Sequence, residues 1–547
     1  MSLFDVVLLN GGLIAQAGET VQAVNKTPLV VICFYMLSLF GIGFLSSRLF
    51  RGSSSDFFVA SQSIGPFMLL MSVFGTTMTA FALVGSTGKA FGLGIGVYGL
   101  MASSSALIHA ACFFLIGIRM WAFGKKYGYM TQIQFFKDRF ESRALGYLLF
   151  PILVGLIIPY LLVGLLGAGS YIGGITRGMF PEVFSGSTPS GSIPPWLTGL
   201  VICSVVLFYV FFGGVRSAVW ANTFQTIVFM IMGIVGFLVI SKGLGGVEAA
   251  SQKALEHAPE KLSREGLMTL PHFISYMLVP LSVGMFPHLF QHWLTAKSAK
   301  AFKLTVIAHP VCIMVVWVPC ILLGMWGAGM FAAGELRLPP LPNGNPNPNA
   351  VLGVMVSRFM ENPVLVGLFS AGVLAAIMSS LDSQFVCVGS MFTNDFLIPL
   401  FGKDKFSDKQ KVIIARVFIV FIVTVTYLIS LSNPRSVFNL GVWCFSGFSA
   451  LFPIVFAAIY WKRTTTAGVF ASIIATVISW CVLAHDALIM GKEARFGKVE
   501  HGEYLVAGVM PVTFIALASA VALVVVSLVT KAPSEKTIRK FFPSISK

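Results

Sequence analysis

The stretch Met71-Ser-Val-Phe-Gly-Thr-Thr-Met-Thr-Ala-Phe-Ala-Leu-Val-Gly-Ser-Thr-Gly88 is an apolar run that is interrupted by small and polar residues. Five residues between positions 72 and 79 are Ser, Gly or Thr. Such residues weaken a helix, and irregular backbone at membrane depth is tolerated only where protein or a wet cavity surrounds it. The stretch therefore predicts a membrane helix that breaks near mid-depth. Close helix packing through small residues is the alternative interpretation.

The composition of the whole chain agrees with a membrane protein. Of the 547 residues, 56% are hydrophobic and 11% are charged, whereas soluble proteins carry about 25% charged residues. This excludes an ordinary soluble protein and a disordered chain. We expect an all-α polytopic membrane protein, with about 13 apolar runs of spanning length. These runs lie near 28–50, 64–86, 94–118, 146–175, 193–212, 218–241, 272–293, 305–333, 364–394, 411–432, 437–461, 465–488 and 504–530.

The distribution of charge predicts the orientation. The chain has 37 Lys and Arg against 21 Asp and Glu. Most of the basic residues fall in short loops after odd-numbered spans, and basic loops face the cytoplasm. We therefore expect the N-terminus outside, the C-terminus in the cytoplasm, and residues 242–271 as an amphipathic segment on the outer surface. The net charge of +16 mostly reflects this loop bias and says little about partners. The partners that we expect are the lipid bilayer and a small-molecule substrate, and no nucleic acid. The first 26 residues show no signal peptide, which is typical of a bacterial inner-membrane protein.

The ninth span contains a polar face. It reads Leu374-Ala-Ala-Ile-Met-Ser-Ser-Leu-Asp-Ser-Gln384. Ala376, Ser379, Ser380 and Ser383 share one helix face, because they lie at i, i+3, i+4 and i+7. Asp382 adds a carboxylate, and carboxylates within spans usually face a pathway or a partner. Hydroxyl and carbonyl oxygens together suit a hard cation, so we interpret this face as a cation site rather than as Ser-mediated packing.

The sixth span begins Gly213-Gly-Val-Arg-Ser-Ala-Val-Trp-Ala-Asn-Thr-Phe-Gln225. Asn222 and Gln225 are three residues apart and share a helix face. No P-loop and no His-Glu-x-x-His sequence occurs in the chain, so we expect no ATPase, no enzyme and no catalytic residue. An intramembrane enzyme is the remote alternative.

These three stretches together resemble the sodium:solute symporter family, most of all its proline and pantothenate permease members. The matching features are Gly213-Gly-x-x-x-Ala-Val-Trp220 with Gln225, Ala376-x-x-Ser-Ser-x-x-Ser383 with Ser390 and Asp395, and the spacing of Ser72, Met78, Gly85, Gly88 and Phe91. The resemblance implies a five-plus-five inverted repeat of the leucine-transporter type. Its expected parts are an outside N-terminus and first helix (1–63), a first repeat (64–241), an outer segment (242–271), a second repeat (272–461), and two extra helices with a basic tail (462–547). Pro280, Gly284 and Pro287 in the seventh span fit the second broken helix that this fold requires.

The resemblance also implies two ion sites. The main sodium (Na⁺) site would use the backbone carbonyls of Gly75, Met78 and Ala376 and the hydroxyls of Ser379 and Ser380. Many family members have Asp where this chain has Asn222, and often a small hydroxyl residue where it has Asp382. We therefore hypothesise that Asp382, Ser383, Ser379 and Asn222 form a second cation or proton site. A structural role for Asp382, with a single sodium ion, is the alternative.

The expected function is sodium-coupled symport of a small organic solute by alternating access. Aromatic residues with a few hydroxyls favour an amino acid or small organic acid over a sugar, whose hydroxyls would stay unpaired. A proton-coupled symporter or a uniporter in the same fold is the alternative, and the sequence leaves the oligomeric state open. The candidate substrate-binding residues are Thr76, Thr77, Ala80 and Phe81 in the second span, Tyr276, Ser282, Phe286 and His288 in the seventh, and Asn439, Trp443, Ser446 and Phe452 in the eleventh.

Overall fold

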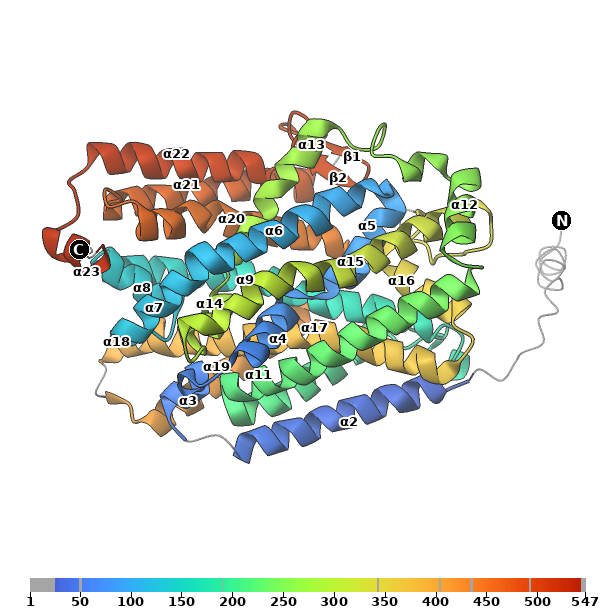
Figure 1. The fold of residues 1–547 in the computed structure, drawn as a ribbon, viewed down its shortest axis with the longest axis horizontal. Coiled ribbons are helices and arrows are strands. Elements are labelled where there is room, and N and C mark those ends of the chain that lie inside the picture. Colours follow the sequence, from blue (N-terminus) through green and yellow to red (C-terminus); the bar gives the residue numbers. More distant parts are fainter. Residues whose placement is uncertain are drawn as a thin grey trace, which may run out of the picture.

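The helices run side by side along the long axis of the molecule (Figure 1). The structure, a computed structural model, describes residues 25–48, 52–188, 190–341, 344–402, 405–432, 436–490 and 493–542. The principal helices are α2 (Thr27–Arg48), α9 (Arg143–Ile175), α11 (Pro195–Gly243), α15 (Phe302–Ala332), α17 (Pro363–Met391), α19 (Asp408–Ser430), α20 (Val437–Tyr460), α21 (Thr466–His485) and α22 (Val512–Val529). The third span is continuous from Tyr98 through α6 (Ser104–Cys112) and α7 (Ile118–Tyr127).

Short elements mark the two ends of the bundle. One end carries α3 (Ser54–Val59), α8 (Gln132–Arg139), α18 (Ile398–Phe401) and α23 (Glu535–Phe541). We call it the tail end. The opposite end carries α12 (Val247–His257), and α13 (Leu270–Ser275) and the strands β1 (Lys498–Glu500) and β2 (Glu503–Leu505) lie along the upper edge of the view, on the side toward that end (Figure 1). We call this end the hairpin end. The remaining short helices are α10 (Pro181–Phe184) and α16 (Val351–Phe359).

Two spans are broken, as the sequence predicts. The first consists of α4 (Pro66–Thr77) followed by Phe81–Gly85 and α5 (Ser86–Leu93), with a bend of 59° between the halves. The second consists of Leu270–Gly284, which is partly a 3-10 helix, and α14 (Pro287–Leu294), with a bend of 47°. Pro287 lacks a backbone N–H, so the second half of this span begins a new helix there.

The expected fifth and sixth spans form one element, α11. Its 49 residues would extend about 74 Å if straight, more than twice the thickness of a bilayer core. The chain turns at Gly214, whose φ of 56° and ψ of −142° are not helical. A Cβ there would lie 2.5 Å from the carbonyl oxygen of Phe57, so the close approach of α3 and the positive φ both require glycine.

The number of spans depends on how α11 is counted. In the described residues, ten helices are long and apolar enough to cross a membrane, or up to twelve if each bent pair forms one span. This count takes α11 as one span, and its two halves on either side of Gly214 would make thirteen. The expected span 504–530 is also shorter, because residues 503–505 form β2 and the helix begins at Val512. Ala507 and Gly508 have positive φ values of 49° and 76°, which end the apolar run as a turn.

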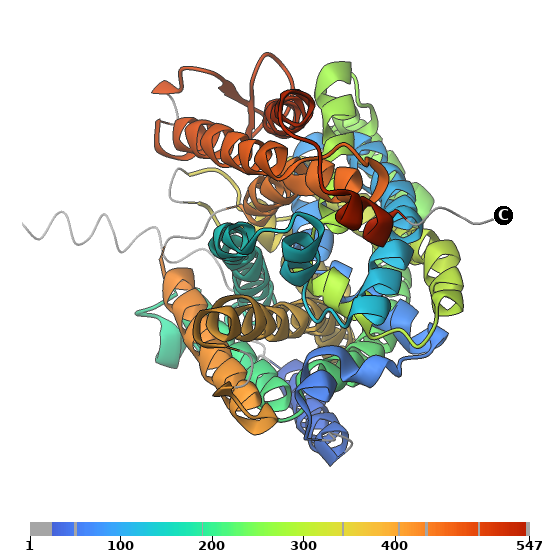
Figure 2. The same ribbon diagram turned by 90° about the vertical axis from the view of Figure 1, so that its left-hand side faces the viewer.

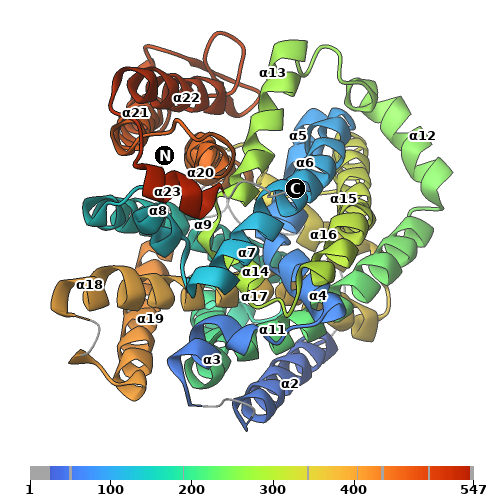
Figure 3. The same cartoon turned by 60° about the vertical axis from the view of Figure 1, so that its left-hand side comes forward.

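The centre of the bundle is formed by α17 and α20. In the most apolar 18-residue stretch of each helix, 83% is buried inside the protein, compared with 28% in α22. Viewed along the bundle, α21 and α22 lie on one side and α2 lies on the opposite side (Figures 2 and 3). The core is therefore built around α17 and α20, and the last two long helices flank it.

Candidate ion and solute sites

The break in the first broken helix exposes backbone near α17. The helix α4 ends at Thr77 because Met78 is extended, with φ −89° and ψ 107°. The Met78 N–H bends back to the carbonyls of Phe74 (3.1 Å) and Gly75 (3.2 Å). On the other side of the break, the Thr79 hydroxyl accepts a hydrogen bond from the N–H of Phe81. Carbonyls beside such a break can bind a cation, as in other transporters with discontinuous helices.

Ser379 joins the central helix α17 to this break. Its hydroxyl lies 2.8 Å from the carbonyl oxygen of Gly75 and 2.9 Å from that of Ala376. Asn362 begins α17 by accepting hydrogen bonds from the N–H groups of Val364 and Leu365. The structure thus brings together three neutral oxygens from the predicted sodium site.

The other two predicted sodium ligands are also buried in this region. Met78 is the first residue after α4, and no backbone N–H of the described residues donates a hydrogen bond to its carbonyl. The Ser380 hydroxyl accepts a hydrogen bond from Gln384 at 2.9 Å. Close packing explains Gly75, because a Cβ there would collide with the Thr226 hydroxyl, which itself donates to the Met71 carbonyl.

Asp382 is fully buried and lies among neutral polar groups. Tyr209 donates to its Oδ2 at 3.0 Å, and the Ser383 hydroxyl lies 2.9 Å from its Oδ1. In the described part of the chain, no Lys, Arg or His forms an ion pair with this carboxylate. A buried carboxylate without a cationic partner is costly, so this position favours a proton or a bound cation.

A chain of hydrogen bonds connects Asp382 to both broken helices. The Asn222 amide donates to Ser383 at 2.9 Å, and its own Oδ1 is buried without a hydrogen-bond partner. His292 Nε2 lies 2.8 Å from the Ser383 hydroxyl, and His292 Nδ1 lies 2.6 Å from the Ser72 hydroxyl. The residues of the second predicted site lie on α11 and α17, and His292 and Ser72 connect them to α14 and α4.

Sequence reasoning missed three of these partners. Tyr209 gives no signal in an apolar span, and Ser72 stands out only as part of the resemblance and not as a site residue. His292 looks like an ordinary helix residue of α14, four positions after His288. In the structure, the two ring nitrogens of His292 contact two different hydroxyls. No cluster of three or more metal-ligating side chains occurs in the described residues.

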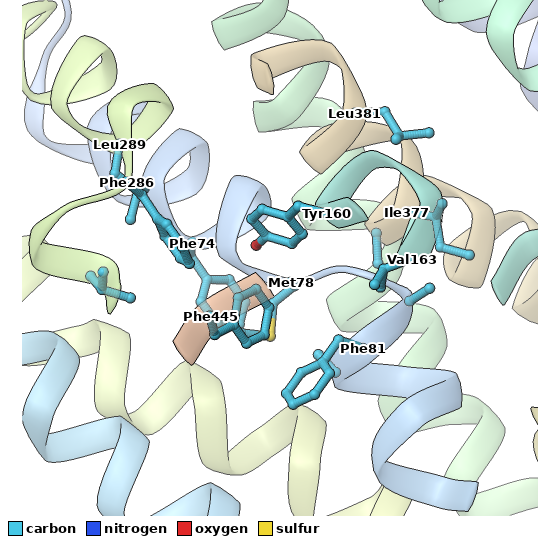
Figure 4. Packing of buried hydrophobic residues seen from close by; sticks show 14 of the residues in the cluster. Phe74, Met78, Phe81, Tyr160, Val163, Phe286, Leu289, Ile377, Leu381 and Phe445 are labelled. Atoms are coloured by element: carbon cyan, nitrogen blue, oxygen red, sulfur yellow. The ribbon is translucent and has the colours of Figure 1, made fainter. Parts of the chain in front are cut away.

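Aromatic rings fill the space next to the first break (Figure 4). Phe81 stacks on Phe438 at 5.0 Å and meets Phe445 edge-on at 4.9 Å. Phe286, from the second broken helix, lies 5.6 Å from Phe445 and 5.3 Å from Tyr160 of α9. Of this cluster, the sequence predicted Phe81 and Phe286. It missed Tyr160, Phe438 and Phe445, which look like ordinary apolar helix residues.

The other candidate solute residues are dispersed. Thr76 is buried with an unpartnered hydroxyl, whereas the Thr77 hydroxyl bonds to Phe74 and His309. Tyr276 and Ser282 are buried in the first half of the second broken helix. Asn439, Trp443 and Ser446 line a separate cavity of about 160 Å³ together with Glu503 and Tyr504. The structure thus divides the predicted single pocket into an aromatic cluster at the break and a cavity under the hairpin.

Comparison with known proteins places the chain in a family. The sequence profile described as the sodium:solute symporter family matches residues 57–476. Sodium/proline symporter 2 of Staphylococcus saprophyticus is 25% identical over 469 residues, which cover 84% of this chain and 87% of that protein. The sodium/proline symporter of Staphylococcus aureus (strain JH9) is 26% identical over 480 residues, covering 85% of this chain and 89% of that protein.

Solved structures share the fold. A Na⁺-coupled sialic acid symporter in a substrate-bound outward-open state superimposes with a TM-score of 0.71 at 16% identity, covering 93% of this chain and 99% of that one. A nucleobase-cation-symport-1 family transporter superimposes with a TM-score of 0.51 at 14% identity, covering 89% and 97%. The two broken helices fit the predicted inverted-repeat core of the leucine-transporter type. The chain therefore belongs to the sodium:solute symporter family and couples the transport of a small organic solute across a membrane to sodium.

Proposed function

We propose that the transported solute is a small amino acid or organic acid and that transport proceeds by alternating access between the two repeats, 64–241 and 272–461. The observation that carries the coupling is the Ser379 hydroxyl, within 2.9 Å of carbonyls from both α4 and α17. A sodium ion bound by these oxygens stabilises α4 against α17. Because sodium and solute favour the same arrangement, each raises the affinity of the other by the same factor.

The solute class is supported by the walls of the candidate site. Phe81, Phe286, Tyr160 and Phe445 offer apolar surface and one phenolic hydroxyl. A sugar would leave several hydroxyls without partners there, which is costly. The two relatives are named as proline symporters, and proline is a small amphiphilic acid of the proposed class.

The proposed orientation follows from the basic loops. The N-terminus and the hairpin end face outside, and the tail end faces the cytoplasm. In support, the tail end carries the basic residues of α7 and α8, among them Lys125, Lys126, Lys137 and Arg139. Short basic loops remain on the cytoplasmic side during insertion.

Thermal stability of the purified protein tests this function. We expect an amino or organic acid to raise the unfolding midpoint with sodium present and to have little effect when potassium replaces sodium, because only the sodium-bound form presents the solute site. The panel contains amino acids, monocarboxylates, sugars and vitamins. A solute that stabilises the protein equally in both salts contradicts sodium coupling, and stabilisation by sugars alone contradicts the solute class.

Proton coupling is a second candidate, and the buried Asp382 favours it. We expect Asp382→Asn to lower the sodium Hill coefficient of solute binding if the carboxylate binds a second sodium ion, or to flatten the pH dependence of transport if it carries a proton. Either result assigns a coupling role to the carboxylate, because the amide can neither neutralise a cation nor release a proton.

The matched control for this experiment is Asp138→Asn. Asp138 lies in α8 at the tail end, where Tyr129 and Lys540 contact its carboxylate. We expect it to leave both the Hill coefficient and the pH profile unchanged. A wild-type Hill coefficient and pH profile in Asp382→Asn would leave Asp382 with a structural role only.

A further inference from the structure

A buried carboxylate connects the two broken helices at the hairpin end. Glu503 Oε1 lies 2.7 Å from Lys89 Nζ, and Glu503 Oε2 lies 2.6 Å from His272 Nε2. The three side chains are 4%, 7% and 4% exposed, respectively. Lys89 belongs to α5 in the first broken helix, and His272 belongs to α13 at the start of the second. Glu503 itself lies outside both repeats.

The local sequence explains how Glu503 reaches this place. His501 and Gly502 both have positive φ, 47° and 78°, as a type I′ turn between two strands requires. The turn makes Glu503 the first residue of β2, opposite Glu500. Asn439 of α20 donates to the Gly502 carbonyl at 2.7 Å. The hairpin is therefore held on the central helix, with the Glu503 carboxylate directed at Lys89.

Two cavities adjoin this ion cluster. One, of about 370 Å³, is lined by Lys89, Phe438 and Asn439 and reaches the exposed residues His501 and Gly502. The other is the 160 Å³ cavity that contains Trp443 and Glu503. The larger cavity has the size of a small-molecule pocket. A solute entering from the hairpin end would thus meet Lys89 before it reaches the smaller cavity.

The electrostatics of the cluster favour an anion. Burial alone would raise the pKa of the Glu503 carboxyl, but Lys89 and His272 lower it to about 2, so the group is charged at neutral pH. If Glu503 left without a replacement, the buried Lys89 ammonium would lose its ion-pair partner, which is costly. A second carboxylate in the same place would satisfy Lys89 equally well.

We propose that Lys89 and His272 form an entry site for the carboxylate of the transported solute, and that Glu503 fills this site when no solute is bound. The proposal rests on the proposed function, because it takes the solute to be an acid. An arriving carboxylate replaces Glu503 and releases the hairpin from α5 and α13. The path into the cavity beside Trp443 then opens, with the aromatic cluster beyond it. The site selects carboxylates over neutral solutes before the ion sites are involved.

Glu503→Gln tests the competition between the two carboxylates. If Glu503 fills the site about 90% of the time, its removal tightens solute carboxylate binding about tenfold. We would measure the Kd of L-lactate and of its neutral isostere lactamide from shifts in the unfolding midpoint of the purified full chain. We expect a lower Kd for lactate and an unchanged Kd for lactamide. Lys89→Gln should abolish the preference for lactate.

Glu335→Gln is the matched control. Glu335 forms a 2.6 Å ion pair with Lys253, and the two side chains are 45% and 34% exposed, respectively. Neither residue lines either cavity. We expect it to leave both Kd values unchanged. If Glu503→Gln lowered the Kd of lactate and the Kd of lactamide equally, the hairpin would only block the cavity sterically, and the proposal would be overturned. So would a lactate preference that survives Lys89→Gln.

Amide hydrogen exchange in the wild-type protein gives a test that needs no variant. Displacement of Glu503 should release the hairpin, so lactate should speed exchange in β1 and β2 and lactamide should not. The same measurement without sodium separates this proposal from the proposed function, because the entry site needs no bound ion. Faster exchange with lactate in sodium-free buffer supports the entry site even if sodium coupling fails. Unchanged exchange with lactate in both buffers overturns it.

Discussion

We expect Ser379→Ala to weaken sodium-dependent solute binding strongly while the protein stays folded. The substitution removes one of the three oxygens that meet at the break, namely the hydroxyl that joins α17 to the Gly75 carbonyl. A hydrogen bond or ligand contact to a charged group contributes about 1.5–3 kcal/mol, so the sodium Kd should rise by about 10- to 150-fold. The measurement is the sodium dependence of the unfolding midpoint, at a fixed concentration of the solute that the panel identifies.

Ser519→Ala is the control for this experiment. Ser519 is buried in α22 and shares a 2.8 Å hydrogen bond with Ser472 of α21, outside the core. Its loss removes the same chemical group from a membrane helix, and we expect a small decrease in stability with an unchanged sodium Kd. A wild-type sodium Kd in Ser379→Ala would remove this hydroxyl from the sodium site.

Arg216→Gln causes the largest loss of stability that we expect. Arg216 follows the turn at Gly214, and its guanidinium forms bidentate hydrogen bonds with Asp56. Nη2 donates to Oδ1, and Nε lies 3.0 Å from Oδ1 and 3.1 Å from Oδ2. It also donates to the Ala60 carbonyl at 3.0 Å. The Asp56 carboxylate is fully buried. Removing one partner of a buried ion pair leaves an uncompensated charge and costs about 3–5 kcal/mol.

The free energy of unfolding in mixed micelles measures this loss. Arg539→Gln, which breaks an exposed pair with Glu535 at 3.2 Å, is the control and should leave the unfolding free energy almost unchanged. The double variant Asp56→Asn with Arg216→Gln should recover part of the stability, because it removes both buried charges. A loss no larger in Arg216→Gln than in the control would contradict a structural role for the pair.

This ion pair also gives a physical reason for the run Gly213-Gly-Val-Arg216. Gly214 supplies a backbone conformation and a close approach that no side chain permits. Arg216, two residues later, ties the turn to α3, and the two halves of α11 are thereby held at the tail end. The sequence reasoning used the run as a family feature and did not foresee the partner Asp56, which is 160 residues away.

The sequence by itself determined what depends on neighbouring residues. Apolar runs of spanning length predict the helices, because each helix satisfies its own backbone hydrogen bonds within the membrane. The small residues around Gly75, together with Pro280 and Pro287, predict the two breaks, since they weaken or remove local helical bonds. The face shared by Ala376, Ser379 and Ser383 follows from helical periodicity alone. The predicted start of the last span, at residue 504, was wrong because apolar composition does not distinguish a hairpin and turn from the start of a helix.

Only the tertiary structure decided which side chains meet. Tyr209 and Asp382 are 173 residues apart, His292 and Ser383 are 91 apart, and Lys89 meets Glu503 from the other end of the chain. Such contacts depend on the depth and rotation of each helix within the bundle, which arise from the packing of all helices together. Hydropathy and spacing report the environment of a single helix. They therefore predicted the polar faces of the candidate ion sites but not the aromatic cluster or the carboxylate at the hairpin end.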